Sequence, residues 1–204
     1  VGAFIYHDWT ELVLTKVPDE LKGQTLLPTF RGRARETQLV QAFRETPHPS
    51  SVNPDQVVLT WSESPRTTQT IQWRGGPTVG AGTVRYQEKQ ADAASNWKET
   101  AASSQKITDG FLINDPLINH FTATLPDLKP ATAYVYTVGG PTADMRSQPA
   151  EFTTAPDGDS PFTFVFLSDT HNSPACRRLL DHALARFPEA AFCTISGDLV
   201  NTGQ

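Results

Sequence analysis

The stretch Leu128-Lys129-Pro130-Ala131-Thr132-Ala133-Tyr134 indicates the fold of the central part of the chain. It leads directly into residues 135–138, an alternating segment of β-branched and aromatic residues. In a tyrosine corner, a Tyr at the start of a late strand forms a hydrogen bond with the backbone a few residues upstream and fixes the corner of a β-sandwich. We therefore predict a β-sandwich in which Tyr134 has a structural role.

Short runs of β-branched and aromatic residues, separated by Pro, Gly, Asn and Ser, surround this stretch over residues 51–155. That texture is typical of an all-β sandwich. In a strand at residues 56–62, Val57, Leu59 and Trp61 fall on one face. Further strands are predicted at residues 68–73, 83–87, 135–138 and 151–154.

The regions around these strands are less regular. Residues 91–115 are polar, and we interpret them as a long loop or a distorted sheet edge with a strand around Trp97. Residues 1–50 form an N-terminal extension without an assigned structure, in which residues 37–44 suit either a short helix or a strand. Residues 156–161, with two Pro residues and a Gly, are predicted to link two domains.

Two apolar runs after this linker predict a strand, a helix and a parallel strand within residues 162–204. Residues 162–167 are almost continuously apolar, as expected for a strand covered on both faces. Ser173 and Pro174 form an N-cap and first-turn pair, and the helix should end by Pro188. Residues 190–195 complete the β-α-β unit. The predicted fold class is mostly β, with a sandwich followed by the first β-α-β unit of an α/β domain.

Three side chains with metal-binding chemistry follow the two predicted strands of this unit. Asp169 and His171 come just after the first strand, and Asp198 comes just after the second. Ligands of open α/β sheets bind at the carboxyl ends of the strands, and neighbouring strands lie about 4.8 Å apart. We therefore predict that these side chains converge on one or two ions, with Asp198 as the bridge. Either half alone would more often be a turn or helix cap.

Other reactive side chains have simpler interpretations. His182, Arg177 and Arg178 lie on the predicted helix and are interpreted as solvated surface residues, although the arginines could approach a phosphate. Cys176 and Cys193 are predicted to be free, buried thiols, since two cysteines do not make a disulfide framework.

Composition excludes several classes of partner. The chain has 204 residues, a net charge of −5 and a pI near 5.5. It has no cluster of Lys and Arg, so we expect no nucleic-acid partner. It also has no apolar run of the roughly 20 residues that a membrane helix needs, so no membrane partner is expected.

The residues at the two strand ends resemble those of a known superfamily. Residues 164–171 (FVFLSDTH) and 197–201 (GDLVN) are similar to the first two motifs of calcineurin-like metallophosphoesterases. Residues 51–155 resemble the fibronectin-III-like N-terminal domain of purple acid phosphatases, through residues 57–61, 128–136 and 152–156. The order of the two domains also agrees with that family.

This resemblance implies a function for the full-length protein. It would hydrolyse phosphate mono- or diesters by attack of a hydroxide held by two ions such as Fe, Mn or Zn. Asp169 and His171 would bind the first ion, and Asp198 would bridge both. Domain pairing of this kind implies a secreted or periplasmic protein.

Two departures separate the chain from typical purple acid phosphatases. These enzymes usually have Gly at the position of His171 and a Tyr ligand at the position of Asn201. We therefore expect Asn201 to stand near the ions without the coloured tyrosine–iron bond.

The remaining motifs of the superfamily, a Gly-Asn-His stretch and two later His-containing loops, do not occur in the sequence. We therefore expect the chain to be an N-terminal fragment with no complete catalytic set, inactive alone, and able to self-associate through its incomplete α/β unit. The alternative is a fibronectin-like module that binds protein or carbohydrate, for example through Trp97.

Overall fold

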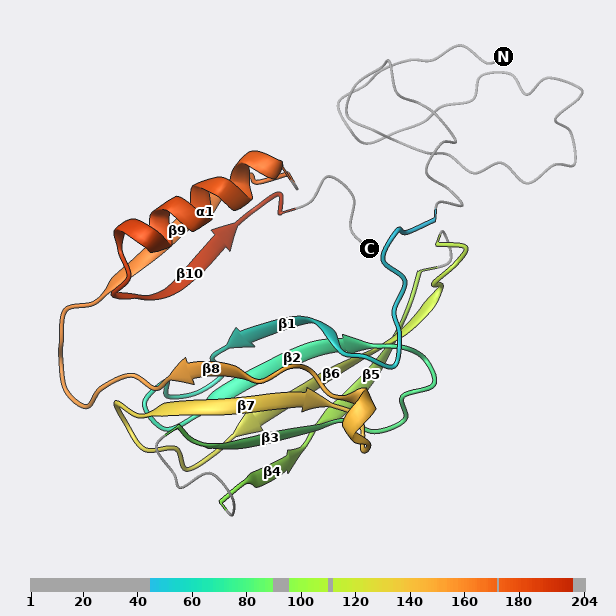
Figure 1. Ribbon diagram of the computed structural model, residues 1–204, viewed down its shortest axis with the longest axis horizontal. Coiled ribbons are helices and arrows are strands. Elements are labelled where there is room, and N and C mark those ends of the chain that lie inside the picture. Colours follow the sequence, from blue (N-terminus) through green and yellow to red (C-terminus); the bar gives the residue numbers. More distant parts are fainter. Residues whose placement is uncertain (1–44, 90–95, 110–111, 172, 200–204) are drawn as a thin grey trace, which may run out of the picture.

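The computed structural model describes residues 45–89, 96–109, 112–171 and 173–199. These residues form a β-sandwich followed by a smaller β-α-β unit (Figure 1). Most of the predicted N-terminal extension lies outside the described residues, and so does Asn201. The described residues contain no helix long and apolar enough to cross a membrane.

Two four-stranded antiparallel sheets make up the sandwich. The first contains, in spatial order, β1 (Asp55–Thr60), β2 (Gln69–Gly75), β6 (Leu117–Leu125) and β5 (Ser103–Thr108). The second contains β4 (Lys98–Ala101), β3 (Thr83–Glu88), β7 (Ala133–Gly139) and β8 (Ala150–Thr153). A 3₁₀ turn, η2 (Ala143–Met145), connects β7 and β8. This strand order is that of immunoglobulin-type sandwiches with one added strand, β4.

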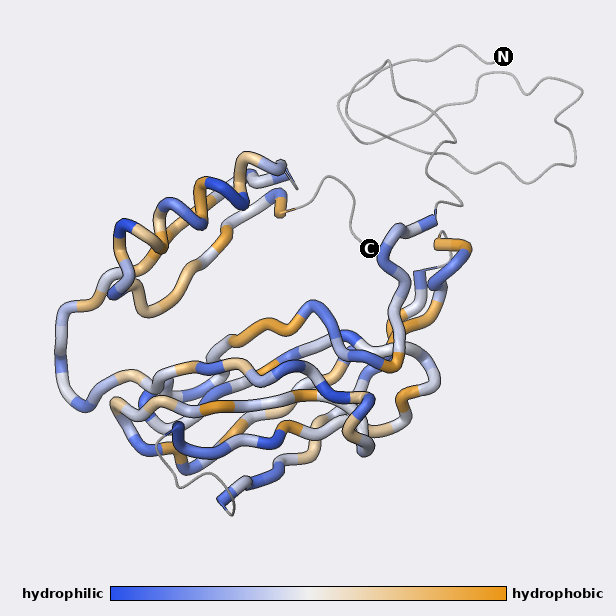
Figure 2. Tube along the Cα trace, in the orientation of Figure 1, coloured by the Kyte–Doolittle hydropathy of each residue, from blue (hydrophilic) through white to orange (hydrophobic). Residues whose placement is uncertain are grey.

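The core lies between the sheets, because alternate side chains of the central strands point inward. In β6, every second residue from Asn119 to Leu125 is buried. The rings of Trp73 and Phe121 stack at 5.4 Å between centroids, and each side chain is at most 1% exposed. Complete burial of one such side chain stabilises the fold by about 1.5–3 kcal/mol. Figure 2 shows hydrophobic stretches along the strands of the sandwich, separated by hydrophilic ones.

The predicted tyrosine corner is confirmed. Tyr134, at the start of β7, accepts a hydrogen bond from the backbone N of Lys129 at 2.8 Å through its hydroxyl. The ring of Tyr134 is 4% exposed and stacks on Phe152 of β8. The side chain therefore fixes the turn that precedes β7 and also fills the core.

The interpretation of residues 91–115 was incomplete. This region holds two strands, β4 and β5, which are edge strands of opposite sheets. All of β5 is exposed, which explains why its residues read as polar and irregular. The longest strand, β6, was also not identified as a separate strand. Trp61 lies beyond the end of β1 and is 47% exposed, so it does not share the core with Val57 and Leu59.

The C-terminal unit has the predicted order of elements. Parallel strands β9 (Thr163–Ser168) and β10 (Ala190–Ser196) are joined by α1 (Pro174–Arg186). Ser173 caps this helix, since its side chain accepts a hydrogen bond from Ala175 N at 3.2 Å. These elements, together with the sandwich, confirm the predicted fold class.

Two expectations about burial in this unit were wrong. β9 is not covered on both faces. α1 packs on one face, and on the other face the contact of Trp61 with Phe192 of β10 leaves Phe164 and Phe166 46% and 61% exposed. The cysteines are free, as predicted, but Cys193 is exposed and Cys176 is only half-buried. With two strands and one helix, the unit has too little surface to enclose these side chains.

Candidate metal centre

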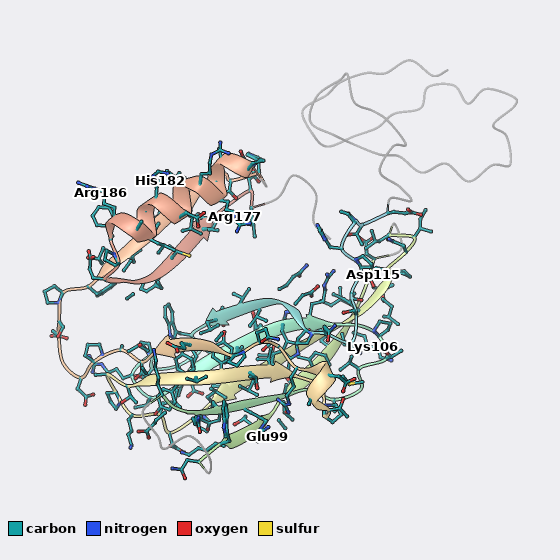
Figure 3. The ribbon with its side chains drawn as sticks, viewed as in Figure 1. Glu99, Lys106, Asp115, Arg177, His182 and Arg186 are labelled. Carbon is teal, nitrogen blue, oxygen red and sulfur yellow. The ribbon has the colours of Figure 1, made fainter. Side chains whose placement is uncertain are left out.

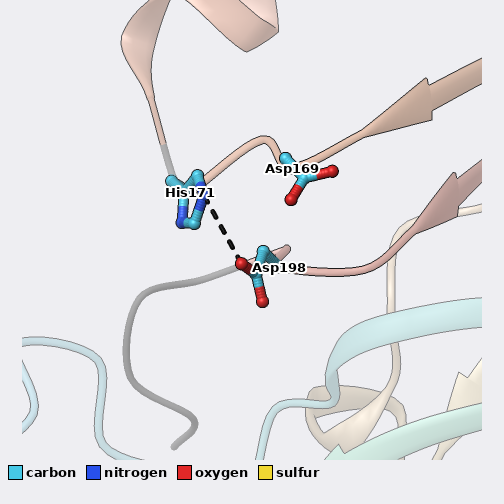
Figure 4. A group of neighbouring side chains, drawn as sticks. All are labelled: Asp169, His171 and Asp198. Carbon is cyan, nitrogen blue, oxygen red and sulfur yellow. Dashed lines mark ion pairs between the residues drawn. The ribbon is translucent and has the colours of Figure 1, made fainter. Parts of the chain in front are cut away.

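Asp169, His171 and Asp198 lie together at the carboxyl ends of β9 and β10 (Figure 4). The two strands are adjacent and parallel, with Ser168 paired to Ser196 at their ends. The loop that follows each strand therefore begins at the same edge of the sheet. This pairing brings residues almost thirty positions apart in the sequence into one group.

The donor atoms of the three side chains lie within 4.8 Å of one another. His171 Nε2 is 3.6 Å from Asp198 Oδ2. Two ligands of a single ion, each about 2.1 Å from it, lie at most about 4.2 Å apart, so the group fits one ion after small side-chain movements. Carboxylate and imidazole donors suit several first-row transition metals.

The backbone at these three residues is unusual. Asp169, His171 and Asp198 have φ values of 51°, 47° and 38°, in the left-handed region that L-residues seldom occupy. Gly197, beside Asp198, also has a positive φ of 73°. Asp and His tolerate this conformation better than most residues, but each such residue still costs free energy. Strained residues of this kind tend to cluster at functional sites.

Hydrogen bonds between the two loops hold this backbone. His171 N donates to Asp198 O at 2.8 Å, Ser168 Oγ donates to Ser196 O at 2.6 Å, and Thr170 Oγ1 donates to Leu199 O at 3.1 Å. Ser168 Oγ also lies against the carboxylate of Asp169. Sequence reasoning missed the positioning roles of Ser168 and Thr170, although both flank Asp169 in the strand-end motif.

The three side chains are exposed; His171 and Asp198 keep 45% and 63% of their side-chain surface in solvent. A shallow hollow next to Asp169 is lined from the helix side by Cys176, Arg178 and His182. Arg178 thus lines the same hollow as Asp169, while Arg177 does not line it. Figure 3 shows Arg177 and His182 on α1, where both are exposed as predicted.

The sandwich that precedes this group matches a known family. Residues 54–154 match the model of the purple acid phosphatase N-terminal domain. The sandwich belongs to this family. A purple acid phosphatase N-terminal domain thus precedes the β-α-β unit, as the resemblance predicted. No curated protein sequence matches the chain significantly.

The fold is also similar to that of solved structures. Purple acid phosphatase PPD1 from yellow lupin (Lupinus luteus) seeds aligns with a TM-score of 0.60 and 18% identity, over 72% of this chain and 30% of the lupin chain. A redesigned β-sandwich protein aligns at 17% identity over 52% of this chain and 97% of its own, with a TM-score of 0.34. The third fibronectin III domain of human KIAA0343 protein aligns at 17% identity over 56% and 90%, with a TM-score of 0.33.

The lupin alignment extends beyond the purple acid phosphatase N-terminal domain, because 72% of the chain is more than the family model covers. It therefore takes in residues outside 54–154. The chain nevertheless spans only 30% of the lupin protein.

Proposed function

We propose that this chain is part of a metal-dependent phosphoesterase related to purple acid phosphatases, with Asp169, His171 and Asp198 as metal ligands. The observation that carries the proposal is the convergence of these three side chains within 4.8 Å, directly after a purple acid phosphatase N-terminal domain. Substrates would be phosphate mono- or diesters. A secreted or periplasmic location would accord with this domain pairing.

The three ligands divide the work according to their chemistry. Asp198 approaches Asp169 and His171 from the loop after β10 and has two carboxylate oxygens, so it can bridge two ions, while Asp169 and His171 would complete the first ion's set. The ions would be Fe, Mn or Zn. When bound, a metal pair stabilises charge on phosphate oxygens and supplies a nucleophile at neutral pH. A second ion would need donors beyond these three, so we expect the chain alone to be inactive.

The protein's own contribution to this chemistry is placement. The hydrogen bonds of Ser168 and Thr170 hold the two loops at a fixed separation, and the strained backbone turns all three side chains to the same edge. Arg178, which lines the adjacent hollow, could hold an oxygen of a phosphate group as a charged donor. Asn201 is proposed to stand near the ions, as the resemblance implies.

The alternative function, a module that binds sugar or protein through Trp97, is less well supported. Trp97 is half-buried, and the guanidinium of Arg85 lies 5.5 Å from its ring centroid. One face of the ring is therefore occupied within the chain, which reduces its use as a stacking platform.

Metal titration of the 204-residue chain tests the ligand assignment. We expect Mn²⁺ or Zn²⁺ to bind weakly, with one ion per chain, and Asp198→Asn to weaken binding roughly tenfold or more. Asp181→Asn, which neutralises an exposed carboxylate on α1, is the matched control and should bind as the wild type does. Equal binding by wild type and a variant lacking all three ligands would refute the assignment.

A further inference from the structure

The turn between β1 and β2, residues 61–68, contacts the part of the chain that follows the sandwich. The ring of Trp61 meets the ring of Phe192 in β10 edge to face, with 5.0 Å between centroids and 76° between planes. The edge-to-face arrangement at this distance is a favourable geometry for two aromatic rings. This turn of the sandwich therefore touches the β-α-β unit directly.

The same turn also holds the start of the connecting segment. Ala155 N donates a hydrogen bond to Pro65 O at 2.9 Å, and Arg66 Nη2 donates to Gly158 O at 3.1 Å. Ala155 O in turn accepts from Ala131 N at 3.1 Å, beside the tyrosine corner. The segment predicted to be a linker is thus attached to the sandwich over its first residues.

Phe192 belongs to a small aromatic cluster on one face of the two-stranded sheet. Its ring stacks on Phe164 at 5.2 Å and lies 6.0 Å from Phe162. Val165, which alternates with Phe164 along β9, is 9% exposed and therefore lies on the other face, under α1. Figure 1 shows α1 on the side of β9 and β10 that is turned away from the sandwich. The aromatic cluster thus lies on the face that the sandwich can reach.

We propose that residues 61–68 are a docking surface by which the sandwich sets the orientation of the β-α-β unit. Trp61 is the anchor, and the backbone contacts at Pro65 and Arg66 limit the freedom of the connecting segment. The first predicted strand, residues 56–62, ends within this turn. Trp61, which the sequence periodicity placed in the core, instead contacts the β-α-β unit. The contact involves none of the proposed metal ligands, and it stands whether or not the chain binds metal.

Limited proteolysis of the full chain tests this docking. Endoproteinase Asp-N cleaves before Asp157 and Asp159, in the segment that the turn holds. We expect Trp61→Ala to raise the initial rate of cleavage there roughly threefold or more, because loss of the ring contact increases the population of open forms. Trp61→Phe keeps an aromatic ring and should restore most of the protection. Small-angle scattering should show a larger radius of gyration for Trp61→Ala.

Trp97→Ala is the control, since Trp97 is an aromatic residue of the sandwich that meets Arg85 instead of the β-α-β unit. It should be cleaved at the wild-type rate. Phe192→Ala removes the other ring of the same pair. It replaces Trp61→Ala as the test variant if Trp61→Ala loses its β-sheet circular dichroism. The double variant should be cleaved no faster than either single one. Cleavage of both Trp61→Ala and Phe192→Ala at the wild-type rate, or equal acceleration by Trp97→Ala, would overturn the proposal.

Discussion

Tyr134 shows how one side chain can stabilise the sandwich in two ways. Its ring is buried against Phe152, and its hydroxyl accepts the hydrogen bond of Lys129 N at 2.8 Å. Loss of the hydroxyl alone would leave that backbone N–H, in a partly buried position, without its partner. An unsatisfied buried donor costs more than an absent hydrogen bond does.

Tyr134→Phe should therefore lower the free energy of unfolding of the sandwich by about 1–2 kcal/mol. Urea unfolding followed by circular dichroism measures the change. Tyr136→Phe is the control, because Tyr136 lies on the same strand and is equally buried, at 4% exposed, but its hydroxyl forms no hydrogen bond within the described part of the chain. Equal destabilisation by the two substitutions would show that the corner hydrogen bond contributes nothing.

Tyr136 also predicts an alkaline limit to stability. Burial raises the pKa of Tyr136 above its ordinary value of 10.0, because the charged phenolate is poorly solvated there. The unfolded chain loses this proton first, so the stabilisation is present below pH 10 and is lost as the pH rises through the higher folded-state value. Unfolding free energies measured from neutral to strongly alkaline pH should fall less steeply for Tyr136→Phe than for the wild type. Parallel curves would contradict this expectation.

At the scale of elements, an ion network joins strands β1 and β2 to the loop before β6. Arg74 is 2% exposed and donates two hydrogen bonds to Asp55, at 2.8 and 2.6 Å. A second carboxylate, Asp115, lies 3.6 Å from Arg74 Nη1 and accepts hydrogen bonds from the backbone N and hydroxyl of Ser50. Arg74 also donates to His48 O at 2.9 Å. The network thus fixes the chain before β1 against the sheet.

Arg74→Ala should destabilise the sandwich by about 3–5 kcal/mol, because it leaves the buried carboxylate of Asp115 without its cation. The matched control is Arg85→Ala, which removes an exposed pair with Glu99 at 3.8 Å and should cost about 0–1 kcal/mol. Thermal or urea unfolding of both variants gives the comparison. A small effect of Arg74→Ala would mean that water replaces the guanidinium.

Helices and strands were predicted well where their own residues carry a strong local sequence pattern. Ser173 and Pro174 mark the start of α1, and Pro188 follows its end, because capping depends on neighbouring residues alone. Edge strands β4 and β5 were not separated, since an edge strand has no buried face to impose alternation.

At the scale of the whole molecule, the described residues leave a large apolar surface on the β-α-β unit. Phe162 and Phe166, on the face of the strands opposite α1, are 66% and 61% exposed. Exposed apolar surface of this kind usually takes part in an interaction. The predicted self-association of the chain remains a prediction, and this face is where we expect it.

The chain should therefore form dimers or larger species as its concentration rises. Phe166→Thr should weaken this association roughly tenfold, because association would bury the large apolar side chain of Phe166 and the substitution removes that apolar area. Sedimentation velocity over a range of protein concentrations measures the self-association of the two proteins. Ile107→Thr, at a residue that is 42% exposed on β5, is the control for loss of apolar surface elsewhere. A chain that stays monomeric throughout would contradict the prediction.

The sequence by itself determined the local features of this protein. The tyrosine corner, the helix cap and the order of the strands in the C-terminal unit depend on residues close together in the chain, so their patterns are legible. The same holds for the position of Asp169, His171 and Asp198 at strand ends, because these residues come just after apolar runs.

Tertiary structure decided which of these local features meet. The parallel pairing of β9 and β10 brings Asp198 to 3.6 Å from His171, and Asp169, His171 and Asp198 have positive φ values in the loops that this pairing brings together. The contact between Trp61 and Phe192 joins parts of the chain that no local pattern relates. An apolar periodicity shows that a side chain needs a partner, but only the folded chain determines whether that partner lies in the core or on the next domain.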